Sequence, residues 1–213
     1  MKYEAIVMGV SAGGMEALST ILPDLSADFP LPVMVVQHQH PTSDDFLVRY
    51  LNERCNLMVK QADEKENIRS GFIYMASPDY HLMVEEDRTF SLSIDHPVHF
   101  ARPSIDVLFE TAAEVYGEKL VGVVLTGASA DGSHGLKRIK ESGGLAMVQD
   151  PETAEVDIMP RAAARATEVD YVLPLEEIGP FLNKLTIVEA KRPPARRAYG
   201  SERNPDLSGM SEG

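Results

Sequence analysis

The chain has 213 residues, of which 44% are hydrophobic and 25% are charged, so it is long enough for one sizeable domain with a packed core. Its formal net charge of −13 argues against a nucleic-acid partner and against docking on an anionic membrane, because both need an excess of Lys and Arg. Cys55 is the only cysteine, which excludes an internal disulfide and fits a reducing compartment.

The predicted elements alternate between strands and helices along most of the chain. Residues 3–9 form an apolar strand that glycine ends, and apolar side chains at helical spacing follow from residue 14 until Pro23. A nearly continuous apolar strand is expected at 31–40 and a helix at 44–53. Beyond residue 100, helices are expected at 102–117, 131–143, 159–167 and 175–185, and strands at 119–127, 144–150 and 170–174.

Residues 57–100 follow a different sequence pattern. Short apolar runs at 72–76, 81–85 and 90–94 are separated by charged and turn residues, which predicts antiparallel hairpins. The whole pattern therefore predicts an α/β fold: a doubly wound, mostly parallel sheet with helices on both faces and an inserted antiparallel hairpin region.

We expect two parts along the chain. Residues 1–190 are predicted to form the folded domain, and residues 191–213 a disordered tail that is basic and rich in Pro, Gly, Ser and Arg. No stretch reaches the ~18 apolar residues of a membrane span, and Glu4 and Gly9 interrupt any signal-peptide pattern. The expected location is the cytoplasm, without membrane insertion.

Polar side chains follow three of the predicted strands. Ser11 comes after the first strand, His38 and His40 at the end of the second, and Asp131 after the strand at 119–127. Ligands bind beyond the carboxyl ends of parallel strands, so these side chains are expected on one rim. A hydroxyl, an imidazole and a carboxylate together are what a serine hydrolase needs.

The turn "GVSAGG" at 9–14 allows more than one interpretation. Its glycines could display Ser11 at the top of the sheet as a nucleophile. The pattern also half-matches a dinucleotide-binding turn, but Ser11 replaces a glycine there and "QHQHP" stands where a ribose-binding acid belongs. Ser11 could also simply cap the following helix, and Asp131 could do the same before its own helix.

The remaining polar candidates carry weaker signals. The H-x-H pattern at 38–40 has no Cys or Glu at ligand spacing, so we expect no metal and no cofactor. His134 is expected to be a solvated helix side chain, and Cys55 a packing thiol.

Several motifs, in order from about residue 3 to 187, resemble the catalytic domain of the bacterial chemotaxis protein-glutamate methylesterases, the CheB type. They are "GVSAGGMEAL", "VVQHQHP", "YMASPDYHLMVE", "RPSIDVLFETAAEVYG", "VVLTGASADGSHGL" and "VQDPETAEVDIMPRAA". The resemblance implies a serine hydrolase that removes methyl esters from glutamyl residues of chemoreceptors, releases methanol and also deamidates receptor glutamines.

The resemblance also implies site residues. It makes Ser11 the nucleophile, His38 the base and Asp131 the residue that orients the base. The substrate and oxyanion region is expected at Ala12, Gly13, Ala128 and Met159. The implied partners are the methylated cytoplasmic domains of chemoreceptors.

This chain departs from the family pattern in places. Ala12 stands where some members have Thr, His40 where Pro is common, and Ala128 where chemotaxis enzymes have Met. The family's N-terminal receiver domain does not precede the catalytic motifs, so we expect constitutive activity or regulation by a separate protein or the tail. The alternatives are a non-catalytic scaffold of a chemosensory array and a nucleotide-binding protein.

Overall fold

The computed structural model describes residues 2–187, so the tail predicted at 191–213 lies outside the described residues. A seven-stranded sheet has the order β3-β4-β2-β1-β7-β8-β9, and all its neighbouring strands are parallel, which confirms the predicted fold class. Its strands are β1 (Ala5–Val10), β2 (Val33–Gln37), β3 (Met58–Gln61), β4 (Phe72–Met75), β7 (Leu120–Val124), β8 (Leu145–Gln149) and β9 (Tyr171–Leu173).

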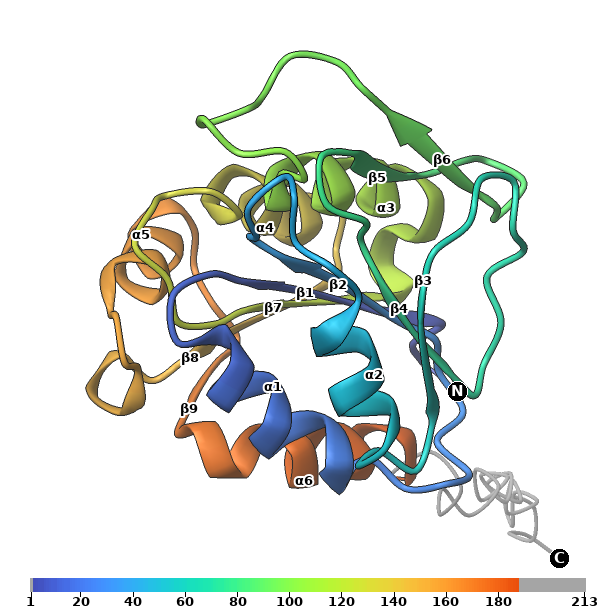
Figure 1. Ribbon diagram of the computed structural model, residues 1–213. Helices are drawn as coiled ribbons and strands as arrows, with labels where there is room; N and C mark the ends of the chain where they lie inside the picture. Colours follow the sequence, from blue (N-terminus) through green and yellow to red (C-terminus); the bar gives the residue numbers. More distant parts are fainter. Residues whose placement is uncertain (1, 188–213) are drawn as a thin grey trace, which may run out of the picture.

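Helices cover both faces of this sheet (Figure 1). They are α1 (Gly14–Ile21), α2 (Phe46–Asn52), α3 (Ile105–Tyr116), α4 (Ser133–Glu141), α5 (Ile158–Ala166) and α6 (Leu175–Ile187). Successive strand residues point to opposite faces, so each buried strand contributes side chains to two hydrophobic cores, one on each face of the sheet. In β1, Ile6 and Met8 pack with α1 and α6, whereas Ala5 and Val7 pack with α3, α4 and α5.

The hairpin prediction for residues 57–100 is correct only in part. β5 (His81–Val84) and β6 (Phe90–Ser93) do form a separate antiparallel hairpin. The run at 72–76 was expected in a hairpin too, but it contains β4, which pairs parallel with both β2 and β3. The prediction failed there because residues 62–71 join two parallel neighbours without the helix that usually marks such a crossover.

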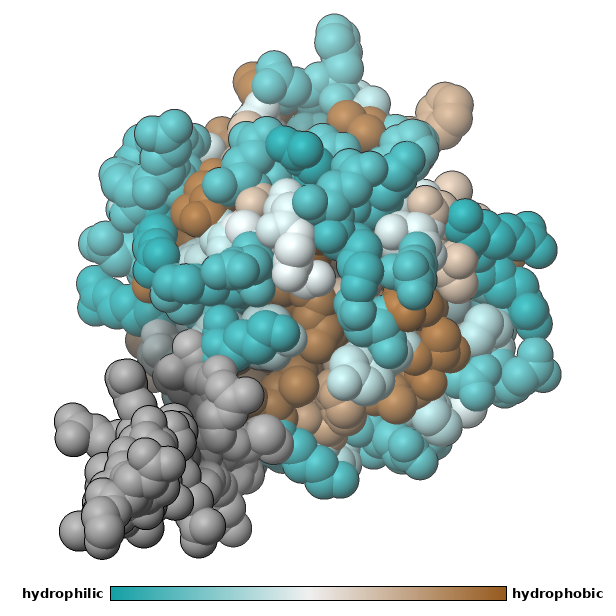
Figure 2. Space-filling view, turned by 180° about the vertical axis from the view of Figure 1, so that it is seen from behind, coloured by the Kyte–Doolittle hydropathy of each residue, from teal (hydrophilic) through white to brown (hydrophobic). Residues whose placement is uncertain are grey.

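The face seen from behind is mostly hydrophilic, with hydrophobic residues gathered in smaller patches (Figure 2). Strand β9 forms one edge of the sheet and leaves Tyr171 and Val172 exposed. None of the helices within residues 2–187 combines the length and apolar character that crossing a membrane requires.

Strand order places the carboxyl ends of β1, β2 and β7 at the middle of the sheet. The chain leaves β1 toward β2 on one side, while β7 and β8 extend the sheet on the other side. In doubly wound sheets, ligands bind in the crevice where the strand order reverses in this way. The three loops that carry Ser11, His38 and Asp131 therefore follow the strands at the switch point of the fold.

Candidate active site

Ser11 lies in the turn between β1 and α1. Its N–H donates to the carbonyl of Thr126 (3.0 Å), just beyond β7, and its own carbonyl accepts from Gly14 N (2.9 Å). Gly13 caps α1 with φ 78°, in the left-handed region that favours glycine, and within residues 2–187 no side chain caps this helix. The interpretation of Ser11 as a helix cap is therefore wrong, and its hydroxyl is left for another role.

Gln37, which sequence reasoning did not single out, ties Ser11 to His38. Strand pairing matches Val10 with Gln37, so Ser11 and His38 leave adjacent strands at the same level. The buried Gln37 side chain donates from Nε2 to the carbonyls of both Ser11 (3.0 Å) and His38 (2.8 Å). Its position as the last residue of a buried strand is the sequence signal that could have marked it.

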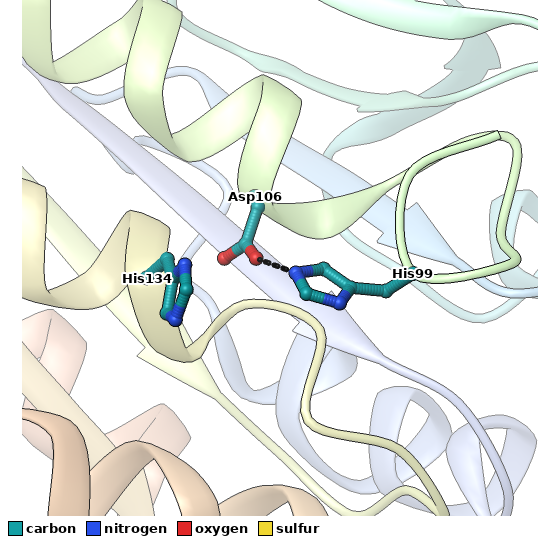
Figure 3. Close-up of side chains that lie close together, drawn as sticks. All are labelled: His99, Asp106 and His134. Atoms are coloured by element: carbon teal, nitrogen blue, oxygen red, sulfur yellow. Dashed lines mark ion pairs between the residues drawn. The ribbon is translucent and has the colours of Figure 1, made fainter. Parts of the chain in front are cut away.

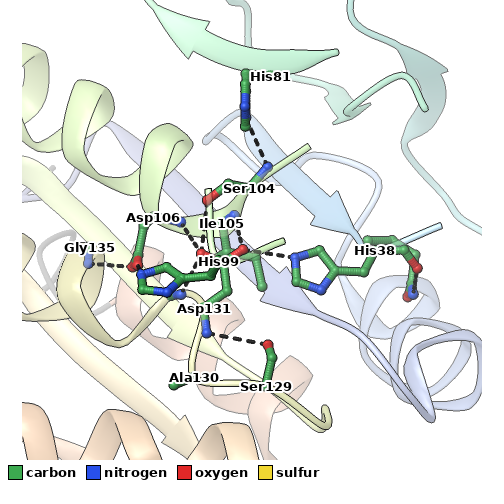
Figure 4. Close-up of polar contacts among 12 residues, drawn as sticks. His38, His81, His99, Ser104, Ile105, Asp106, Ser129, Ala130, Asp131 and Gly135 are labelled. Carbon is green, nitrogen blue, oxygen red and sulfur yellow. Dashed lines mark hydrogen bonds and ion pairs between the residues drawn. The ribbon is translucent and has the colours of Figure 1, made fainter. Parts of the chain in front are cut away.

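His38 and Asp131 are brought together by a hydrogen bond of 2.8 Å between Nε2 and Oδ2 (Figure 4). The Asp131 side chain is fully buried and receives four further hydrogen bonds. Its donors are Ser104 Oγ (2.8 Å), Ile105 N (2.7 Å), Asp106 N (3.0 Å) and Gly132 N (3.1 Å). Every one of these four groups is placed as a donor, as an ionised carboxylate requires.

The pKa of Asp131 reflects two opposing effects. Burial works to raise it, but the hydrogen bonds from His38 and from the backbone N–H groups of Asp106 and Ile105 outweigh burial and hold it below the ordinary aspartate value. Because the carboxylate can only accept, the proton between the two side chains belongs to His38 Nε2. His38 Nδ1 then carries no proton, and its lone pair can accept one.

The capping role considered for Asp131 is real but concerns another helix. The N-cap of α4 is Gly132, and the side chain that accepts from the first turn of α4 is that of Asp106, from Gly135 N (2.7 Å), not that of Asp131. Asp131 instead accepts from the first N–H groups of α3, which begins about one strand and one helix earlier in the chain. The positive end of the α3 dipole thus stabilises the charge that His38 faces.

The other predicted site residues differ in exposure and in hydrogen bonding. Among residues 2–187, the N–H groups of Ala12 and Gly13 donate no hydrogen bond, so both are free for an oxyanion. Ala128 is exposed, whereas Met159 is buried. His40 is exposed and pairs with Thr42 Oγ1 (2.8 Å), away from Asp131.

Ser11 and His38 each border an open hollow. Ser11 lines a hollow of about 660 Å³ together with Gln37 and Glu155, and His38 lines one of about 280 Å³ together with His99 and Arg102. Within residues 2–187 no hydrogen bond joins the Ser11 hydroxyl to His38. Hydrogen bonds between catalytic groups often tighten only once substrate is bound.

Cys55 lies outside this group. Its side chain is half-buried and packs against the core on the α1 face of the sheet. Burial raises the pKa of its thiol to about 11, so the reactive thiolate is scarce at neutral pH. This agrees with its interpretation as a packing residue.

Gly127 separates Ser11 from Met159, so we predict that Gly127→Ala is harmful. A Cβ there would lie 2.0 Å from Met159 Sδ and 2.9 Å from Ser11 Cβ. Such overpacking costs about 1–3 kcal/mol and would shift the Ser11 turn, lowering both thermal stability and the activity of this site. Gly71→Ala is the control, because its Cβ would meet no atom within 4 Å and only the φ of 86° is unfavourable. Equal losses of activity in the two variants would contradict the prediction.

Comparisons with known proteins identify the family of this chain. The family CheB methylesterase matches residues 6–182. A Leptospira interrogans protein, described as a candidate protein-glutamate methylesterase/protein-glutamine glutaminase, is 58% identical over 185 residues, which cover 87% of this chain and 96% of that protein. A Thermotoga maritima protein-glutamate methylesterase/protein-glutamine glutaminase is 36% identical over 84% of this chain and 53% of its own length.

A solved structure gives the same answer for the fold. The crystal structure of the Thermotoga maritima CheB methylesterase catalytic domain superimposes with a TM-score of 0.83 at 34% identity, and the match covers 87% of this chain and all of that domain. The described fold, the switch-point site and the sequence similarity thus coincide over one region. The chain belongs to the CheB methylesterase family.

Proposed function

We propose that this protein is a protein-glutamate methylesterase that hydrolyses γ-glutamyl methyl esters on the cytoplasmic domains of chemoreceptors, and that it also deamidates receptor glutamines. Family membership supports the reaction class. The observation that carries the proposal is the hydrogen bond between the partly buried His38 and the fully buried Asp131, next to the strand end that bears Ser11. A scaffold that had lost catalysis would have no need of a basic imidazole nitrogen here.

The proposed reaction passes through an acyl-enzyme. His38 Nδ1 takes the proton of Ser11 Oγ while Oγ attacks the ester carbonyl, and Asp131 stabilises the imidazolium that forms. His38 then gives that proton to the departing methoxide, which leaves as methanol. Water then attacks the acyl-enzyme while His38 takes its proton. His38 returns that proton to Ser11 Oγ, which leaves, and glutamate is released.

The oxyanion of each tetrahedral intermediate needs preorganised donors. The unpaired N–H groups of Ala12 and Gly13 at the start of α1 are the candidates, and removal of one such donor from a comparable site costs ~10²–10³ in rate. Ala128 and the buried Met159 complete the proposed wall of this region. The mechanism requires neither a metal nor a cofactor.

Methanol release from methylated receptor membranes tests the proposal. The protein is expected to release methanol from methylated receptors and none from receptors that were never methylated. Ammonia release from receptors that carry glutamine at the same positions tests the deamidase activity separately. A protein that binds the receptor membranes but releases no methanol would support the scaffold alternative and contradict the proposal.

A further inference from the structure

Three side chains outside the catalytic set converge beside it. His99 lies on the turn at 98–101, Asp106 in the first turn of α3 and His134 in the first turn of α4 (Figure 3). One potential ligand atom from each lies within 4.8 Å of the other two. The two imidazole rings stand nearly perpendicular, with centroids 5.7 Å apart.

Asp106 provides the independent reason to expect a ligand there. Its side chain is only 4% exposed, and Oδ1 accepts from Gly135 N (2.7 Å). The other oxygen, Oδ2, is buried and has no hydrogen-bond partner among residues 2–187, although His99 Nε2 lies 3.2 Å away at ion-pair distance. A buried carboxylate oxygen without a partner is unfavourable, so this atom is unsatisfied until a cation or a proton reaches it.

We propose that His99, Asp106 and His134 bind a divalent transition-metal ion of the zinc type. Two imidazoles and one carboxylate are a common set of three protein ligands for Zn²⁺, with water in a fourth position. Bonds of about 2.0–2.2 Å place tetrahedral ligand atoms about 3.3–3.6 Å apart. Because His99 and His134 are exposed, rotation of their side chains can bring all three atoms to that spacing.

The surroundings suit a cation in spite of two helix N-termini, whose dipoles oppose positive charge. At α3 the first N–H groups already face the Asp131 carboxylate, which lies directly beside Asp106. The Gly135 N–H fixes the Asp106 carboxylate by its other oxygen, as outer hydrogen bonds commonly do for metal ligands. The net charge of −13 further favours cation binding.

The ion would clamp the His99 turn against α3 and α4. In this turn His99 and Phe100 have φ of 49° and 63°, a left-handed conformation that side-chain-bearing residues rarely adopt, and Val98 pairs with Ala101 across it. His99 also borders the hollow that His38 lines. Metal binding would therefore fix one wall of that hollow. The H-x-H pattern at 38–40, on which the expectation of no metal rested, plays no part in this site.

Titration of the metal-free 213-residue chain with Zn²⁺, followed by calorimetry, tests the site. We expect one ion per chain in the wild type. His99→Ala and His134→Ala should each weaken binding more than about 100-fold, since loss of an outer-sphere partner alone costs about 10–100-fold. Both histidines are exposed, so neither variant should impair folding.

His96→Ala is the matched control, because His96 is exposed in the same segment and its side chain lies outside the cluster. It should bind Zn²⁺ like the wild type, as should His38→Ala. Absence of stoichiometric binding to the wild type would overturn the proposal. Wild-type affinity in His99→Ala and His134→Ala, or loss of binding in His38→Ala alone, would also overturn it and would place the ion elsewhere.

Discussion

Ser11→Ala is expected to lower methyl-ester hydrolysis by roughly 10⁴-fold or more, because Ser11 is the proposed nucleophile and leaves β1 at the level at which His38 leaves β2. The fold should be unaffected, since the Ser11 side chain caps no helix and its backbone hydrogen bonds do not depend on Oγ. Methanol release measured under single-turnover conditions, with the thermal unfolding of the same preparations, checks both parts.

Ser70→Ala is the matched control for this variant. Its hydroxyl donates to Pro30 O (2.7 Å) before β2 begins, at the opposite end of the strands, and its loss should leave hydrolysis unchanged. A serine-reactive fluorophosphonate should label wild-type protein and fail to label Ser11→Ala. Hydrolysis in Ser11→Ala at the wild-type rate would exclude Ser11 as nucleophile and with it the acyl-enzyme mechanism.

The parts of the site that sequence alone could predict are those encoded locally. Ser11 directly follows a fully buried strand and stands two residues before a pair of glycines. His38 likewise directly follows Gln37, the last residue of a fully buried strand. The parallel sheet follows from strands that are apolar throughout and from the helices between them. These patterns lie within about ten residues, the range over which turn and periodicity rules operate.

Features that depend on distant pairing could not be predicted. Strand β3 ends in Lys60 and Gln61 and is joined to β4 by a helix-free loop, so nothing local marks either strand as part of the parallel sheet. The start of α3 is capped by Asp131, 26 residues away from Ile105, although Ser104 stands at the expected capping position. The Ser104 hydroxyl instead donates to Asp131.

The convergence of His99, Asp106 and His134 escaped prediction for the same reason. Each is unremarkable in its own segment, and His134 considered alone resembles a solvated helix residue. The packing of α3 against α4, with Gly135 in contact with Asp106, brings Asp106 and His134 together, and the turn at 98–101 places His99 beside Asp106. A Cβ on Gly135 would lie 2.4 Å from Phe109 Cβ, so the close approach of the two helices itself depends on that glycine.

Asp131→Asn is expected to reduce hydrolysis by about 10⁴-fold, the loss known for the corresponding change in a Ser-His-Asp protease. The variant amide can donate to His38 Nε2, which would then lose its proton to Nδ1 and leave the imidazole in the wrong tautomer toward Ser11. Ser104→Ala is the graded comparison. It removes one of the donors to Asp131 while His38 keeps its partner, so it should have a much smaller effect on the rate.

Asp131→Asn should also destabilise the fold, by about 1–3 kcal/mol, because an amide NH₂ group would face buried N–H donors at the start of α3. The pKa of Asp131 is lower in the folded protein than its ordinary value of about 3.9. Its stabilising contribution is therefore fully present above about pH 4 and is lost as the pH falls through the lower folded pKa. The difference in unfolding free energy between wild type and variant should be constant near neutral pH and shrink in acid. Denaturant unfolding across this range measures it, and a difference that grew in acid would show that Asp131 is not the ionised acceptor in the folded protein.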